Sequence, residues 1–262
     1  MQFQRIFAIL TQEYFIIRGA LEVIFDLIVY PIFSTIIFGF ISLYLAQSAS
    51  KEVAFSILYG MIFWQILYTV QYSVSLGSLW NIWSRNLSNL FVAPLQLNEY
   101  IFAHTLSGIL KALLVVTFCS LMSFFVFHFN LLQVSLPVLV LSFINLVLFA
   151  FSFGLIVLGL IFRFGTRIQG LAWGLLPIFQ PLTAAFYPVN IMPAPLQVVA
   201  YMLSPTYIFE TGRYYVTTHA TRWDYLGIAF LLNTLYVVFA IVIFQFMFAT
   251  SKVTGQFARN ES

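Results

Sequence analysis

Charge is the scarcest ingredient of this 262-residue chain: only 7% of its residues are charged, whereas 62% are hydrophobic. A soluble domain carries roughly 25% charged residues, because its surface must be hydrated. The composition therefore excludes a soluble enzyme and a secreted binding domain. The chain also has a single cysteine, Cys119, which excludes an internal disulfide. We expect an integral membrane protein.

Sequence motifs for nucleotide and metal chemistry are also missing. Lys51, Lys111 and Lys252 lie in no G-x-x-x-x-G-K-[ST] phosphate loop, so ATP binding by that route is not expected. No H-E-x-x-H occurs, and three scattered histidines with one cysteine make no metal site by spacing. The net charge of +3 is small and spread out, without the basic stripe of a nucleic-acid site. We therefore expect no catalytic residue, no metal or cofactor held by this chain, and no nucleic-acid partner.

Long charge-free windows are the feature that the sequence does have. A helical span needs about 20 apolar residues to cross roughly 30 Å of hydrocarbon, whereas a barrel strand shows about ten residues of alternating polarity. The window 112–162 is long enough for two crossings, and His128-Phe129-Asn130 with Pro137 marks the turn between them. The sequence thus predicts an all-α bundle in one transmembrane domain, 1–262. The six expected spans are 27–46, 53–76, 105–127, 136–161, 168–187 and 225–249.

The distribution of lysine and arginine predicts the orientation of these spans. With six spans, seven basic residues fall on one side and three on the other, and Lys111 lies inside the third span. Positive residues favour the cytoplasmic side, so we expect both termini in the cytoplasm. The seven are Arg5, Arg18, Arg85, Arg163, Arg167, Lys252 and Arg259, and the three are Lys51, Arg213 and Arg222.

Two segments outside the spans are predicted to be helices of mixed polarity. Residues 1–20 place apolar side chains along one helical stripe, which is typical of a helix lying in the headgroup plane. Residues 77–98 give a cytoplasmic helix with one polar face, ended by Pro94. Such a helix either lies idle on the bilayer or docks into a groove on a partner, and periodicity alone favours the idle helix.

The segment 188–215 is apolar at first but contains four prolines, which end or kink helices. Irregular backbone at membrane depth survives only where protein or a cavity surrounds it. We expect a re-entrant helical hairpin here, before the last span. Glu210 and Arg213 are three residues apart, so they can pair on one helix face and fix the fold of the hairpin.

Four ionisable residues lie in or beside the spans, where such groups are costly and often functional. Glu22 and Asp26 share one face at the start of the first span, and we expect both to remain in headgroup water. His104 and Lys111 are seven residues apart on one face of the third span. We expect Lys111 to reach towards the cytoplasm, and a contact with a substrate is the alternative.

The order of these elements resembles the membrane subunit of type-2 ATP-binding-cassette (ABC) exporters, a family of drug, lipid and polysaccharide exporters. Two stretches carry the likeness. Trp83 to Leu95, WSRNLSNLFVAPL, followed by Glu99, looks like the family signature between spans 2 and 3. Phe186 to Arg213, with its spaced prolines, Glu210 and the final arginine, looks like the family's YP…P…P…E…R segment.

The resemblance implies a permease subunit in the bacterial cytoplasmic (inner) membrane, moving an amphipathic drug, lipid or glycan outwards. A separate nucleotide-binding ATPase subunit would bind ATP and Mg, and a second copy of this chain would complete a homodimer. The helix that couples the permease to the ATPase would contain Leu87, Asn89, Leu90, Phe91 and Pro94. The substrate path, lined by spans 1, 2 and 5, would include Phe25, Tyr30, Phe33, Trp64, Tyr68 and Phe179. A stand-alone channel or ion-coupled carrier, and an intramembrane enzyme, are the alternatives.

Overall fold

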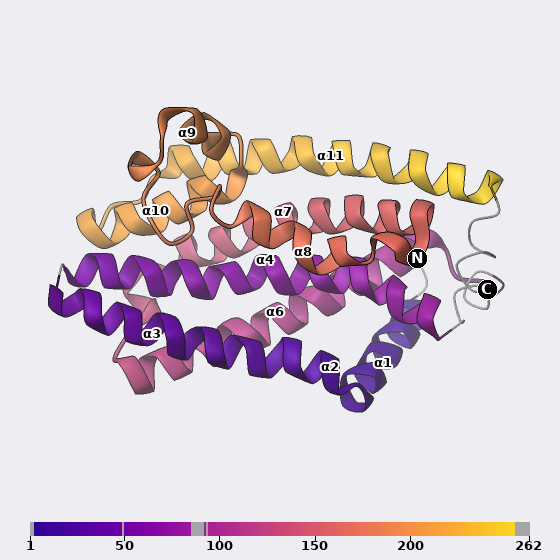
Figure 1. Cartoon of the computed structure of the whole chain (residues 1–262), viewed down its shortest axis with the longest axis horizontal. Coiled ribbons are helices and arrows are strands. Elements are labelled where there is room, and N and C mark those ends of the chain that lie inside the picture. Colours follow the sequence, from indigo (N-terminus) through magenta and orange to yellow (C-terminus); the bar gives the residue numbers. More distant parts are fainter. Residues whose placement is uncertain (1–2, 49, 85–91, 93, 255–262) are drawn as a thin grey trace.

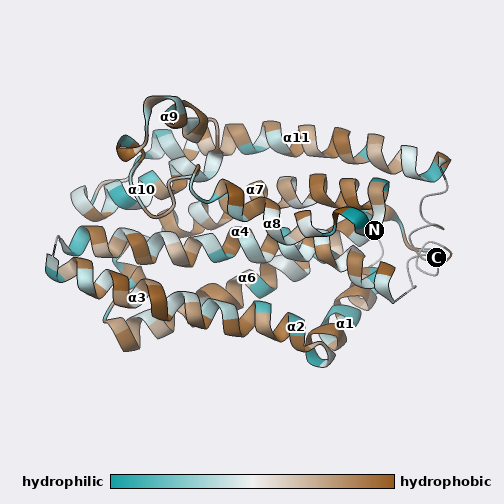
Figure 2. Ribbon diagram, viewed as in Figure 1, coloured by the Kyte–Doolittle hydropathy of each residue, from teal (hydrophilic) through white to brown (hydrophobic). Residues whose placement is uncertain are grey.

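A computed structural model describes residues 3–48, 50–84, 92 and 94–254 (Figure 1). These residues form helices and connecting turns, with no strand among them. Within the described ranges, five helices are long and apolar enough to cross a membrane, and Figure 2 shows hydrophobic residues along their whole length. The expected multi-pass helical membrane protein is confirmed at this level. The five are Leu21–Ser48 (comprising α2, Leu21–Ile24, a π-helical turn, Phe25–Val29, and α3, Tyr30–Ser48), α4 (Lys51–Trp83), α6 (Leu97–Phe127), α7 (Leu136–Phe164) and α11 (Trp223–Val253).

Helix α4 is the centre of the bundle. It packs against α3, α6, α7 and the shorter helix α10 (Ser204–Thr218), and most of its side chains are buried. Because protein surrounds it, α4 contains buried polar residues, among them Gln65, Gln71 and Ser75. Such side chains would be costly on a helix that faces lipid. One of these residues, Gln71, connects α4 to α8, because its Nε2 donates a hydrogen bond to the Ala172 carbonyl at 3.1 Å.

The helix boundaries differ from the predicted ones in two places. The region 77–83, expected to begin a separate helix, continues α4 without a break. The fifth expected span, 168–187, is helical over only part of its length, as a 3-10 turn at Gly165–Ile168 and then α8 (Gly170–Phe179). Prolines explain this early end: Pro177 lies inside α8 and Pro181 follows it, and each removes a backbone donor. The chain continues through turns as far as residue 187.

The segment expected to be a hairpin, 188–215, forms two short helices. They are α9 (Ala194–Tyr201), after a 3-10 turn at Val189–Ile191, and α10. In Figure 1 both lie at the end of the bundle opposite to the start of α6. A Cβ at Gly60 would overlap the Ala185 carbonyl, and one at Gly212 would overlap the Tyr59 ring. Glycine at these positions lets the turn segment and α10 approach the backbone and core of α4.

Asn233 of α11 joins the start of α10 to α7. It is fully buried, it accepts a hydrogen bond from the Ser204 hydroxyl at 2.5 Å, and its Nδ2 donates to the Asn145 carbonyl at 2.9 Å. We expect Asn233→Leu to lower the free energy of unfolding by about 1–2 kcal/mol, because Ser204 and Asn145 lose a buried partner. Unfolding in mixed detergent micelles measures the change. Thr234→Val, which removes a bond only to its own helix, should leave stability nearly unchanged.

Candidate functional site

The segment expected to dock on an ATPase connects α4 to α6. Four of its predicted coupling residues, Leu87, Asn89, Leu90 and Phe91, lie outside the described residues, and Pro94 is exposed. Its first flank is the end of α4, where Trp83 packs edge-on against Trp80 and stacks on Trp173 of α8, with ring centroids 5.3 and 6.1 Å apart.

The second flank is the first turn of α6, which has a capping box. The Gln96 backbone N–H donates to the Glu99 carboxylate at 3.1 Å, and the Gln96 side chain caps the helix in return. Such a reciprocal pair satisfies two of the backbone donors that a helix N-terminus leaves free. Both flanks of the connecting segment are therefore held in place by packing and hydrogen bonds.

Helix α1 (Phe3–Gly19) brings its polar face onto these flanks. Arg5 pairs with Glu99 at 3.3 Å, and the Gln12 amide donates to the Asn81 side chain at 2.8 Å. These polar residues lie off the apolar stripe of the helix, and they face protein, whereas Phe3, Phe7, Tyr14 and Phe15 are exposed. The predicted N-terminal helix exists, and its polar side serves to attach it to the bundle.

A buried charge cluster lies beneath α1, and we call Glu13, His104, Ser107 and Lys111 the Glu13 cluster. One Glu13 oxygen lies 2.5 Å from the Lys111 ammonium and accepts a hydrogen bond from the Ser107 hydroxyl at 3.2 Å; the other lies 3.2 Å from His104 Nδ1. All four side chains are less than 10% exposed. Lys111 therefore ends at a buried carboxylate of α1, and its expected direction towards the cytoplasm stays a prediction.

The electrostatics of the cluster favour an ionised Glu13. Burial by itself raises the pKa of a carboxyl group, but the hydrogen bonds and charges of His104 and Lys111 outweigh it and hold the Glu13 pKa well below its ordinary value. The carboxylate and the Lys111 ammonium thus neutralise one another inside the protein. The cluster attaches α1 to α6.

The three histidines lie at three separate places in the fold. His104 contacts Glu13, and its ring lies edge-on to Tyr100 with centroids 4.4 Å apart. His128 and His219 end α6 and α10 in the left-handed backbone conformation that commonly terminates helices. In the described part of the chain, no three His, Cys, Asp or Glu side chains are close enough to hold a metal ion.

The predicted path residues are only partly brought together. Phe25, Tyr30 and Phe33 are exposed on the first long helix. Tyr30 lies against Tyr68 of α4, with ring centroids 5.6 Å apart.

The other two path residues lie elsewhere. Trp64 is 4% exposed and belongs to the core. Phe179 of α8 packs edge-on against Phe153 at 5.0 Å. Among the described residues, ring contacts therefore join Tyr30 of the first long helix to Tyr68 of α4, and they do not connect Trp64 or Phe179 to this pair.

The predicted ion pair of the hairpin is confirmed. Arg213 and Glu210 are 2.9 Å apart, and Glu210 also accepts a hydrogen bond from the Val189 N–H at 2.9 Å. Arg213 donates to the Ala184 carbonyl at 2.7 Å. Ala184 has φ 53°, which is unfavourable for a residue with a Cβ. The pair therefore holds a strained turn against α10, and we call these four residues the hairpin clamp.

Sequence reasoning missed the partner of Lys111. Glu13 and Lys111 are separated by 98 positions, so no local spacing links them. A signal was present in each helix: Glu13 lies off the apolar stripe of its helix, and His104 and Lys111 share one face of theirs. No protein-family model matches the chain, and a search of curated proteins finds no match.

Proposed function

We propose that this chain is the membrane subunit of an ATP-driven type-2 ABC exporter that moves an amphipathic drug, lipid or glycan out of the cytoplasm or the inner leaflet. ATP and Mg would bind to a separate ATPase subunit, and two copies of the chain would form the permease. The membrane would be the bacterial cytoplasmic (inner) membrane, crossed six times with both termini inside. The fifth crossing would be α8 with the turns that follow it.

The observation that carries the proposal is the hairpin clamp. The stretch from Phe186 to Arg213 resembles a family motif in sequence, and its two charged residues have a common task in the fold. Glu210 and Arg213 bind the backbone at Val189 and Ala184 and so join the start of the motif to its end. Contacts between the spaced residues of the motif support the resemblance to the family more strongly than the sequence match alone does.

In this proposal ATP closes the two ATPase subunits, and the coupling helices transmit the movement to the membrane subunits. The interface between the two permease copies then opens a path. ATP can drive this change only if it binds the two states with unequal affinity. The Glu13 cluster and the capping box of α6 would keep the flanks of the coupling segment rigid, so that the movement is passed on to the long helices.

A pull-down in mild detergent tests the proposal. We expect the wild-type chain to retain an ATPase subunit that has a phosphate loop, and Leu90→Asp/Phe91→Asp to lose it, because carboxylates would disrupt an apolar contact with the ATPase groove. Loss should be at least about tenfold in retained ATPase, equal to about 1.4 kcal/mol of binding free energy.

The matched control is Leu196→Asp/Val198→Asp, which puts the same charges on exposed apolar residues of α9, at the other end of the bundle (Figure 1). This variant should keep the ATPase. A wild-type chain that purifies alone under several gentle conditions would contradict the proposal and favour a stand-alone channel or an ion-coupled carrier.

A further inference from the structure

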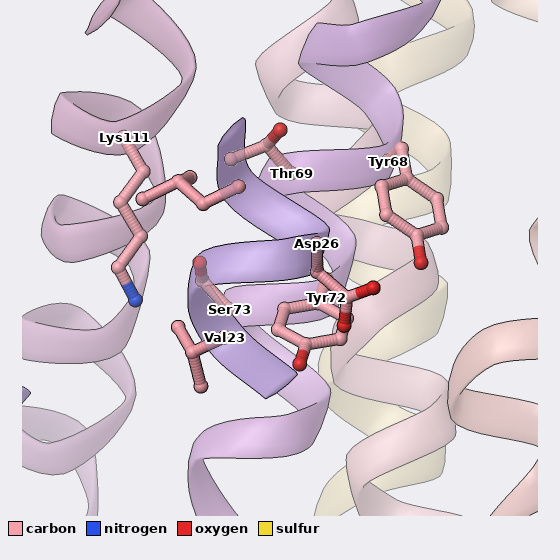
Figure 3. A pocket seen from close by; sticks show the side chains of 8 residues that line it. Val23, Asp26, Tyr68, Thr69, Tyr72, Ser73 and Lys111 are labelled. Carbon is pink, nitrogen blue, oxygen red and sulfur yellow. The ribbon is translucent and has the colours of Figure 1, made fainter. Parts of the chain in front are cut away.

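A carboxylate interrupts the first long apolar helix at its only described π-helical turn. This turn, Phe25–Val29, contains Asp26, and such turns are rare and concentrate at functional sites. We expected Glu22 and Asp26 to share headgroup water. Glu22 is exposed, whereas Asp26 is only partly exposed and turns towards α4 (Figure 3). An ionisable group in an apolar helix is costly, so its position calls for a function.

Asp26 lines a small cavity between the first long helix, α4 and α6 (Figure 3). The Tyr72 and Tyr68 side chains line the same cavity and are close enough to interact with the Asp26 carboxylate. The remaining wall of the cavity combines apolar and small polar side chains. The lining residues are Val23, Asp26, Leu27, Tyr68, Thr69, Tyr72, Ser73 and Lys111.

The negative charge of Asp26 has no basic partner among the described residues. No ion pair of the described chain includes it, and the other charge that acts on it belongs to Glu22, which is also negative. Lys111 lines the same cavity, but its ammonium is 2.5 Å from Glu13. Figure 3 shows this ammonium on the side of the cavity away from Asp26. The cavity thus has a net negative charge next to Asp26.

Aromatic rings surround the carboxylate. Tyr68 lies between Tyr30 and Tyr72, with ring centroids 5.6 and 5.9 Å away. Aromatic faces attract ammonium and guanidinium groups, and the exposed Phe25 on the same turn offers apolar surface to the body of a ligand. A bare Ca²⁺ or Mg²⁺ ion would need about six oxygen ligands, and the cavity offers one carboxylate.

We propose that Asp26, Tyr68 and Tyr72 bind the positive group of a lipophilic organic cation, and that such cations are the substrate class of the exporter. The transport part of this inference rests on the proposed function, but the binding site does not. Asp26 supplies the opposite charge, and the rings of Tyr68 and Tyr72, which line the same cavity, hold the cationic group.

Equilibrium dialysis of the purified chain against tetraphenylphosphonium tests the site. We expect saturable binding to the wild type and about tenfold weaker binding to Asp26→Asn, because the carboxylate that lines the cavity loses its charge. Tyr68→Leu and Tyr72→Leu should each weaken binding by about threefold. Glu22→Gln is the matched control, because Glu22 is four residues away, exposed and outside the cavity lining, and it should weaken binding much less than Asp26→Asn.

A second ligand and a second variant separate binding from folding. Tetraphenylborate has the same shape and the opposite charge, so it should bind at least about tenfold more weakly. Asp26→Glu keeps the charge and should keep binding even if Asp26→Asn does not fold. Equal binding to wild type and folded Asp26→Asn, equal binding of the two ligands, or loss of binding in Asp26→Glu would overturn the proposal. Tetraphenylphosphonium binding by a chain that captures no ATPase would support the site and contradict the exporter.

Discussion

Replacing Glu13 by glutamine is expected to lower the free energy of unfolding by about 3–5 kcal/mol, the cost of leaving a buried charge without its partner. Lys111 would keep its ammonium in a site that is less than 10% exposed, and it pairs with no other carboxylate among the described residues. The Ser107 hydroxyl would also lose its acceptor. Unfolding of the purified chain in mixed detergent micelles measures the loss.

Two variants show whether the unpaired charge is the cause. Glu13→Gln/Lys111→Met removes both charges and should recover most of the lost stability. Asp224→Asn breaks the exposed pair between Arg222 and Asp224 and should leave stability unchanged, because water screens such pairs. A Glu13→Gln protein as stable as the wild type would show that Lys111 finds another partner.

The Glu13 cluster also makes the free energy of unfolding depend on pH. The pKa of Glu13 is lower in the folded chain than its ordinary value of 4.5, so the unfolded chain binds the proton more tightly. The stabilisation is therefore fully present above pH 4.5 and declines as the pH falls below it. The wild type should lose more stability than Glu13→Gln over this acidic range.

Removing Arg213 is expected to open the turn before α9. Arg213→Met abolishes its bonds to the Ala184 carbonyl and to Glu210, and hydrogen bonds of charged groups contribute about 1.5–3 kcal/mol each. The strained turn at Ala184 would lose its main polar contact. We expect a maleimide to label a cysteine at exposed position Asn190 at least about tenfold faster in the variant, since local opening governs access.

The native chain has one cysteine, so background labelling by the maleimide should be low. Cys119 is fully buried, so Asn190→Cys adds the reactive thiol. Arg222→Met removes a partly exposed arginine that pairs only with Asp224 among the described ion pairs, and it should leave the labelling rate unchanged. An unchanged rate in Arg213→Met as well would mean that packing on Gly60 and Gly212, and not the hairpin clamp, holds the turn.

The long helices could be predicted because their cause is local. Charge-free windows longer than a membrane is thick have few stable forms other than a helix. The turn inside 112–162 was located from His128-Phe129-Asn130, and the structure ends α6 at Phe127 and begins α7 at Leu136. The end of α8 could not be predicted from hydropathy, because the helix ends at Phe179, just after Pro177, although the residues that follow are still mostly apolar.

The candidate sites were predicted only where their residues are close in sequence. Glu210 and Arg213 are one helical turn apart, so their pairing follows from spacing. Asp26 and Tyr72, or Glu13 and Lys111, meet only because α4 and α6 pack beside the N-terminal helices. Helix packing depends on the shapes of whole surfaces, and no single spacing in the sequence encodes it.

One carboxylate joins two helices at the end of the bundle where α6 begins. Glu99 accepts from the backbone of Gln96 in the first turn of α6, and it also pairs with Arg5 of α1. A push on the start of α6 is therefore carried directly to α1, whose far end is anchored again through Glu13. Because α1 is attached to α6 at two points, through Arg5 and through Glu13, we expect the two helices to move together as one rigid body.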